Sequence, residues 1–295
     1  RGSRLMSTLK VNTINAATSG QAVAVDVQNP RSFRNLAING AMAVAQRATT
    51  GVTSSGYGTV DRWASNFSGH NEAPTQKQQE LTSSDTGPWE KGFRHQFKVV
   101  NGEQTSTGAS DYLNLQYKFE GQDIATSGWD YTSTSSYITI SFWVKSSVAQ
   151  NFYGFLKTHA GTAQNYPFET GSLTENVWTK ITKTVPGHAN LQFNNDNATG
   201  LSVSITPYWG TAYTSSSGVS LDGWVDWDAS GRNPDNTSTW WEKNDAQFCL
   251  TGFQVEVGSY ATEFEHRSYA DELLRCQRYC FVLTNDSGDY TGFYC

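Results

Sequence analysis

The chain has 295 residues, of which 37% are hydrophobic and only 16% are charged, and its formal net charge at pH 7 is −6. Its 10 Trp, 14 Tyr and 15 Phe can fill a packed core, which argues against a disordered chain. The acidic balance, the lack of a Lys/Arg cluster and the lack of a long apolar run argue against a nucleic-acid partner and against membrane insertion.

The first 32 residues differ in character from the rest of the chain. Residues 1–6 look like an expression-tag remnant. Residues 7–32 alternate small apolar and polar side chains but have too few large ones to form a core alone. We expect 7–32 to attach the chain to other proteins and to trimerise it, with a floppy tail as the alternative. No signal peptide is visible, so we expect synthesis in a reducing cytoplasm and four free thiols: Cys249, Cys276, Cys280 and Cys295.

Residues 33–267 read as a series of strands in which apolar and polar residues alternate with a period of two. In the stretch 113–120, Leu113, Leu115, Tyr117 and Phe119 face one way, and Asn114, Gln116, Lys118 and Glu120 face the other. Such strands need two facing sheets to bury their apolar sides. The pattern therefore predicts an all-β fold, an antiparallel jelly-roll β-sandwich, with an extended N-terminal segment and one short C-terminal helix.

The stretch 209–241 is rich in aromatic residues and has no clear strand period. Its aromatic rings alternate with Asp, Asn, Ser and Thr, a mixture that suits sugars, because rings stack on their C–H faces and polar groups bind their hydroxyls. The alternative is that the rings cover the core or a subunit interface. The glycan-binding candidates are Trp209, Tyr213, Trp224, Trp227 and Trp240, with Trp129 and Tyr131 in a second, smaller cluster.

The last strand of this region changes its alternation. Phe248 and Leu250 share one face, but Phe253 and Val255 continue that face only if one extra residue is inserted. The shift predicts a β-bulge at residues 251–252, where a glycine permits the unusual backbone.

One helix is expected, starting after Ser268, which can cap it together with Asp271. Its apolar stripe would consist of Tyr269, Leu273, Cys276 and Cys280. We expect residues 268–295 to form this helix and the start of a truncated C-terminal unit.

No pattern in the sequence points to catalysis. The five His residues lack metal-ligand spacing, and no nucleophile elbow, P-loop or dinucleotide-binding motif occurs. We therefore assign no catalytic residue and expect a protein that is not an enzyme, although a glycosidase needs only two facing carboxylates and stays open as an alternative. Oxygen ligands for a structural Ca²⁺ occur in the loop 222–235, but without EF-hand spacing, so we assign no metal and no cofactor.

Several short motifs, in a fixed order, resemble a family of bacteriophage tail-fibre and virion structural proteins. They are NLAING at 35–40, QR at 46–47, DRW at 61–63, YITISFWVK at 137–145, WTKITKTVPG at 178–187, GFQVEVG at 252–258, ATEFEHRSY at 261–269 and CQRY at 276–279. The stretch LKVNTI at 9–14 also resembles the start of cyanophage-like fibre proteins.

The resemblance implies a jelly-roll sandwich like that of carbohydrate-binding modules, in a homotrimer attached to other tail or capsid proteins through its N-terminal segment. It implies a virion component, assembled in the host bacterial cytoplasm, that recognises a host cell-surface polysaccharide or acts as a fibre scaffold. The alternative is a glycan-binding module of a secreted or tail-associated carbohydrate-active enzyme. Glu265, His266 and Arg267 are motif residues that we interpret as a polar latch between the last strand and the helix.

Overall fold

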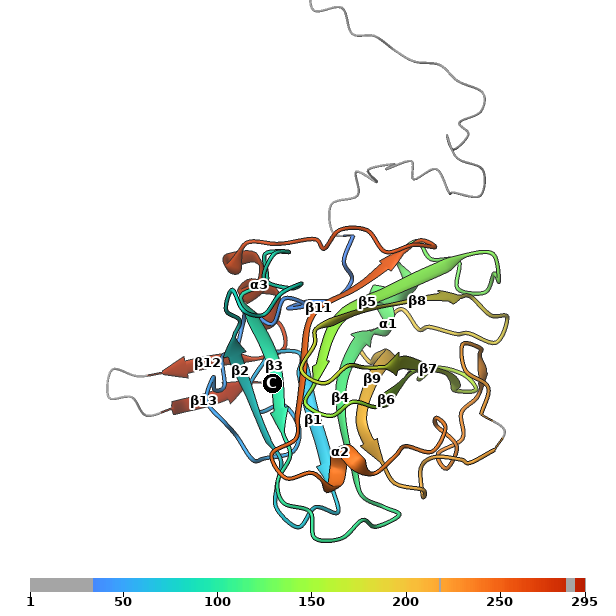
Figure 1. Cartoon of the computed structure of the whole chain (residues 1–295). Helices are drawn as coiled ribbons and strands as arrows, with labels where there is room; N and C mark the ends of the chain where they lie inside the picture. Colours follow the sequence, from blue (N-terminus) through green and yellow to red (C-terminus); the bar gives the residue numbers. More distant parts are fainter. Residues whose placement is uncertain (1–33, 218, 285–289, 295) are drawn as a thin grey trace, which may run out of the picture. The chain divides into compact units, whose positions relative to one another are not determined.

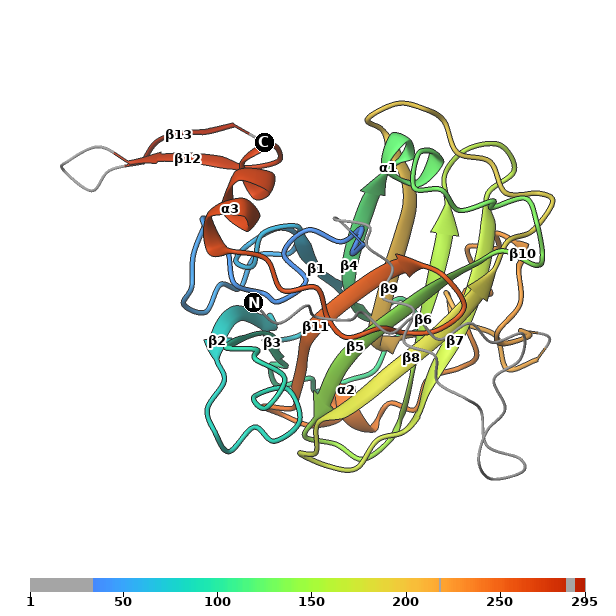
Figure 2. The same cartoon turned by 90° about the horizontal axis from the view of Figure 1, so that it is seen from above.

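A computed structural model describes residues 34–217, 219–284 and 290–294. The expected attachment segment, 7–32, lies outside these residues. Two antiparallel sheets face each other, as Figures 1 and 2 show, and this confirms the predicted all-β jelly-roll sandwich. None of the helices in the described part of the chain is long and apolar enough to span a membrane.

The two sheets contain eleven strands. The six-stranded sheet has the spatial order β1 (Trp63–Ser68), β4 (Tyr112–Glu120), β9 (Thr199–Trp209), β6 (Asn151–Thr158), β7 (Gln164–Ser172) and β10 (Val225–Asp226). The five-stranded sheet has the order β2 (Thr75–Glu80), β3 (His95–Val100), β11 (Gln247–Val257), β5 (Tyr137–Ser146) and β8 (Thr179–Pro186).

The core lies between the sheets and follows the predicted alternation. On β4, Leu113, Leu115, Tyr117 and Phe119 are all buried in the core. Because successive side chains of a strand point to opposite faces, the polar residues between them lie on the outer face of the six-stranded sheet. Two short helices were not predicted, α1 (Gly121–Ala125) and α2 (Thr239–Glu242).

The predicted bulge in β11 is confirmed. The register between β11 and β5 shifts between Thr251 and Gln254. Gly252 has φ +63°, a left-handed conformation that L side chains rarely adopt. The shift returns Phe253 and Val255 to the core, where both are fully buried.

The opening segment runs beside β11 and is held by Glu265 and Arg267 of the predicted latch, whereas His266 contacts Lys91 O instead (2.8 Å). Leu36 N donates to Val255 O (2.8 Å). The Arg267 guanidinium pairs with Glu265 (3.0 Å) and Glu272 (2.9 Å) and donates to Ala37 O (3.1 Å). The latch therefore joins three parts of the chain: the opening segment, the last strand of the sandwich and the helix that follows.

That helix is α3 (Tyr269–Gln277), and Ser268 caps it as predicted, since its Oγ accepts from Asp271 N (3.2 Å). The predicted apolar stripe is partly wrong, because Tyr269 is 60% exposed. Glu272 is buried instead, since its carboxylate pairs with Arg267 and accepts from Asn39 N. A two-stranded hairpin of β12 (Phe281–Thr284) and β13 (Tyr290–Tyr294) follows α3.

Candidate functional site

The outer face of the six-stranded sheet carries a hollow of about 310 Å³, here called the groove. It crosses β4, β9 and β6, which lie side by side in Figure 2. The strand register places its residues in rows across the sheet. One row runs from Gln116 through Ser204 to Phe155, and the next from Lys118 through Ser202 to Lys157.

Short polar side chains form the floor of the groove. Ser202 and Ser204 are buried there although they face outward. Asn114 is only 4% exposed, and its Nδ2 donates to Ser204 Oγ (3.3 Å). Its Oδ1 has no hydrogen-bond partner among the described residues. A buried carbonyl oxygen without a partner is costly, so this atom favours a donor supplied by water or by a ligand.

One wall of the groove is a cluster of stacked aromatic rings. Tyr112 and Trp209 stack with centroids 4.6 Å apart and an interplanar angle of 12°. Tyr213 contacts the Trp209 ring edge-on at 4.7 Å. The Arg232 guanidinium lies 4.2 Å from the centroid of Trp209, a cation–π contact that fixes the ring and the cation together.

A second aromatic pair stands beside this wall. The Trp227 ring packs against Phe155 at 5.6 Å, and the ammonium of Lys157 lies 3.9 Å from the centroid of Trp227. Backbone bonds anchor the loop that carries these groups. Trp227 N donates to Ala163 O (2.8 Å), and Asn165 Nδ2 donates to Arg232 O (2.8 Å). The long aromatic loop is thus tied to the sheet next to the groove.

Basic side chains also line the groove. His159 Nε2 lies 3.0 Å from Ser202 Oγ. Burial, together with the ammonium groups of Lys157 and Lys118, lowers the pKa of His159 to about 4, so its ring is neutral at pH 7. The described residues that line the groove include no Asp or Glu.

The structure brings together three of the seven residues predicted to bind glycans. Trp209 and Trp227 line the groove, and Tyr213 packs against Trp209 and Arg232. Trp224 does not, because it packs on Tyr166 at the edge of the core and its Nε1 donates to Pro186 O (2.7 Å).

The other three candidates belong to the core or its margin. Trp240 is fully buried, so its ring has no free face for a ligand, and it is removed as a candidate. Trp129 is removed as well, because it is buried in the core against Phe193 and lies outside the groove. Tyr131 is half-buried and packs against Phe193 at 4.9 Å.

The sequence did not identify the other residues that line the groove, namely Asn66, Tyr112, Asn114, Gln116, Lys118, Phe155, Lys157, His159, Ser202 and Arg232. The alternation of 113–120 already placed Asn114 and Gln116 on the outward face. That signal could not show that β9 and β6 would extend the same face into a groove.

The acidic residues of the loop 222–235 have separate partners. Asp222 pairs with Lys183 (3.1 Å), Asp226 accepts from Gln164 (2.7 Å), and Asp235 accepts from Thr214 (2.6 Å). Within the described ranges, no three His, Cys, Asp or Glu residues come together as a metal site.

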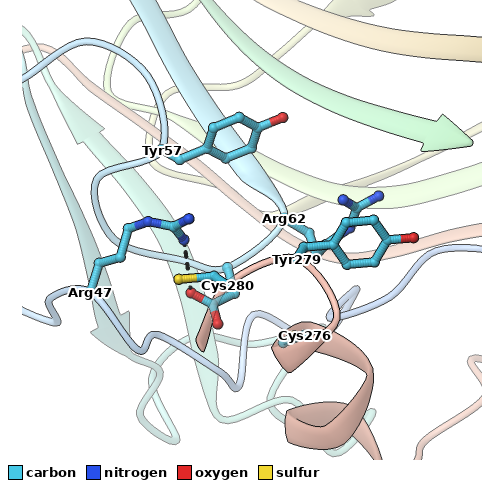
Figure 3. Close-up of a pocket in the computed structure, with 7 residues that line it drawn as sticks. Arg47, Tyr57, Arg62, Cys276, Tyr279 and Cys280 are labelled. Carbon is cyan, nitrogen blue, oxygen red and sulfur yellow. Dashed lines mark hydrogen bonds and ion pairs between the residues drawn. The ribbon is translucent and has the colours of Figure 1, made fainter. Parts of the chain in front are cut away.

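A second hollow, of about 200 Å³, lies where α3 meets the sandwich (Figure 3). The Arg62 guanidinium stacks on the Tyr279 ring, 3.4 Å from its centroid. Arg47 pairs with the buried Asp61 (3.4 Å), whose pKa is raised because its burial outweighs the hydrogen bonds from Gln46 and the charge of Arg47. The Arg62–Tyr279 contact and a hydrogen bond from Gln46 Nε2 to Cys280 O (2.7 Å) hold the end of α3 against the sandwich, so we assign the hollow a structural role.

No family model matches the chain, and no curated protein matches it. Among solved structures, it is similar to the enzymatically active domain of tailspike protein 4 of bacteriophage CBA120, with 7% identity and a TM-score of 0.40. That match covers 77% of this chain but only 22% of the tailspike chain.

Two further solved structures are similar over their whole length. The N-terminal cellulose-binding domain of Cellulomonas fimi β-1,4-glucanase C has 9% identity and a TM-score of 0.33, and the match covers 74% of this chain and 99% of that one. A putative sugar-binding protein of Bacteroides thetaiotaomicron has 10% identity and a TM-score of 0.34, with 76% and 100% covered.

Proposed function

We propose that this chain is a glycan-binding protein whose ligand lies in the groove on the outer face of the six-stranded sheet. The observation that carries the proposal is the combination of aromatic rings at the wall with a floor of amides and hydroxyls. Rings provide apolar contact area, and a few polar groups fix the orientation of a ligand. Asn114 Oδ1, buried and without a partner among the described residues, suits a sugar hydroxyl as donor.

We propose binding rather than hydrolysis in this groove. Most glycosidases need two carboxyl groups on either side of the scissile bond. The described lining offers amides, hydroxyls, rings and cations instead. Incubation with a bound polysaccharide should therefore leave its chain length unchanged, and the release of reducing ends would contradict this part of the proposal.

The finer proposal is that the chain is part of a phage tail fibre or capsid appendage. It rests on the family resemblance of the opening and closing motifs. In the structure, residues from both motifs meet in the latch formed by Arg267, Glu265 and the backbone of the opening segment. The proposal includes a homotrimer, attachment to other virion proteins through residues 7–32, and contact with a host-surface polysaccharide.

Mass spectrometry of purified phage particles tests this finer proposal. Detection of the chain in virions supports it. Detection only in a secreted protein fraction, beside a catalytic domain, supports the alternative of a module from a carbohydrate-active enzyme. The groove is expected to bind glycans in either setting.

Replacement of Trp227 tests the groove itself. Its half-exposed ring stands at the wall, so Trp227→Ala should cost about 1–3 kcal/mol of binding free energy if the ring is a hot spot. Affinity electrophoresis on polysaccharides that bind the unmodified chain measures the loss. Tyr260→Ala is the matched control, since this exposed ring does not line the groove. Equal binding by both variants, with folding intact, would place the glycan site elsewhere.

A further inference from the structure

We infer that the groove selects an acidic polysaccharide, one that carries carboxylate or sulfate groups; this rests on the glycan-binding function proposed above. The chain has a net charge of −6, yet the described residues lining the groove include Lys118, Lys157 and Arg232 and no carboxylate. The groove is therefore a basic site on an acidic protein. A neutral sugar would leave these cations without a charged partner.

The three cations are spread along the groove. Lys118 and Lys157 both lie opposite Ser202, one on each neighbouring strand. Two strand spacings put their backbones about 10 Å apart. Arg232 stands at the aromatic wall, over Trp209 and 5.3 Å from the centroid of Trp227. A bound chain would thus meet positive charge at more than one point along its length.

These cations differ from most others in the described part of the chain. Lys145, Lys183, Arg267 and Arg278, for example, each pair with a carboxylate. No ion pair of the described residues involves Lys118, Lys157 or Arg232.

The lowered pKa values of two groove cations agree with a shortage of negative charge in the groove. Burial and the nearby Arg232 lower the pKa of Lys157. Burial also lowers the pKa of Arg232, against the opposing effect of Tyr213 and Tyr112. An anionic ligand would relieve the repulsion between these cations and gain charge-assisted hydrogen bonds from them.

The same features favour a sugar over a nucleic acid as the anion. Single-stranded nucleic acids also use rings and cations, but they bind along a continuous positive track. Here the polar lining between the cations is Asn114, Gln116 and Ser202, with Ser204 bonded to Asn114, and these groups match hydroxyl groups. A nucleic acid is therefore kept as an outcome of the test.

The test uses the full chain and polysaccharides in matched pairs. Polygalacturonate is compared with its methyl ester, which lacks the charge, and dextran sulfate with dextran, by affinity electrophoresis at low and high salt. A glycan array of acidic and neutral bacterial polysaccharides extends the comparison to further ligands. We expect tighter binding to the acidic member of at least one pair, weakened by salt because the charges are screened. Which pair responds distinguishes carboxylate from sulfate.

The double variant Lys118→Gln/Lys157→Gln should lower the affinity for the acidic polysaccharide of a pair roughly tenfold, and the affinity for its neutral partner much less. Lys77→Gln/Lys180→Gln is the matched control, since these lysines lie on the outer face of the five-stranded sheet. The control should bind like the unmodified chain.

The outcomes separate the two proposals. Suppose that the charged and neutral members of each pair bind equally, that the double lysine variant binds like the unmodified chain, and that Trp227→Ala loses binding. This result would overturn the acidic ligand but would still support a glycan site in the groove. Absence of binding to every polysaccharide would overturn both. Tighter binding to a single-stranded oligothymidylate than to any polysaccharide, lost in the lysine variant, would replace the sugar with a nucleic acid.

Discussion

His159 shows how a single residue reports on the groove. Its ring lies against Ser202. Lys118 is on β4, and Lys157 is near the end of β6, just before His159 in the chain. No carboxylate is among the groups that shift its titration. Protonation would add a third positive charge to a partly buried site, and this is why the folded protein disfavours it.

The pH dependence of stability should reflect this residue. The pKa of His159 is lowered from 6.5 to about 4 in the folded protein, so between these values the unfolded chain binds more protons. The stability that His159 contributes is complete above pH 6.5 and falls as the pH drops towards 4. His159→Gln, which keeps a hydrogen-bonding group beside Ser202, should show a smaller loss in urea denaturation between pH 7.5 and 4.5. An identical loss in both proteins would contradict the prediction.

Residue type alone could not separate groove aromatics from core aromatics. Of the glycan-binding candidates in the stretch 209–241, Trp209 and Trp227 line the groove, whereas Trp240 is fully buried. In the sequence all three fall in a stretch without a strand period, so no alternation shows which rings face inward, and in the structure Trp209 ends β9 while Trp240 lies in α2. The burial of Trp240 follows from its place in α2, which turns the ring towards β11, where Nε1 donates to Gln247 O (3.2 Å).

At the scale of the element, β11 depends on its bulge. The sequence predicted this feature because the apolar face changes parity within one strand. Gly252 occupies the point of change, and a Cβ added there would lie 2.7 Å from Phe93 Cζ and 3.0 Å from Trp143 Cδ1. Both the backbone conformation and the space exclude a side chain.

Gly252→Ala should therefore destabilise the protein by about 1–3 kcal/mol, from backbone strain and the contact with Phe93. Gly223→Ala is the control, because its backbone has no positive φ and no atom lies within 4 Å of the added Cβ. Thermal or urea denaturation compares the two. Equal stability of the two variants would mean that the bulge tolerates a side chain.

The latch makes a separate element-scale prediction. Arg267 has a side chain that is 7% exposed and serves both Glu265 and Glu272. Its removal takes the guanidinium away from two carboxylates that have little access to solvent. Arg267→Ala should therefore lower the free energy of unfolding by about 3–5 kcal/mol. Lys91→Ala breaks the exposed pair with Glu263 and should cost under about 1 kcal/mol. A latch that is dispensable would give both variants the same unfolding midpoint.

The groove as a whole was beyond prediction from the sequence for a topological reason. Alternation identifies the two faces of one strand, and it did so for residues 113–120. The groove exists because β4 pairs with β9 and β9 with β6, which joins segments far apart in the chain. Such pairing depends on the packing of the whole sandwich, and no local pattern encodes it.

At the scale of the whole molecule, oligomeric state is the main prediction. Residues 7–32 lie outside the described residues, and their small alternating side chains favour order only against further chains. Light scattering at micromolar concentration should give a mass about three times the 32.5 kDa of one chain. Deletion of 7–32 should give a folded monomer that keeps glycan binding. A stable monomer of the full chain would contradict the trimer.

The arrangement at the latch has a mechanical consequence. The opening segment and β11 run in opposite directions, because Leu36 N donates to Val255 O and Phe253 N donates to Gly40 O. The chain thus enters the sandwich at Arg34 beside the point where it leaves towards Arg267, which bonds to that segment. Tension between these two points would peel the pair apart one hydrogen bond after another instead of shearing many at once. The load would fall first on the latch and on this pair, before it reached the six-stranded sheet that carries the groove.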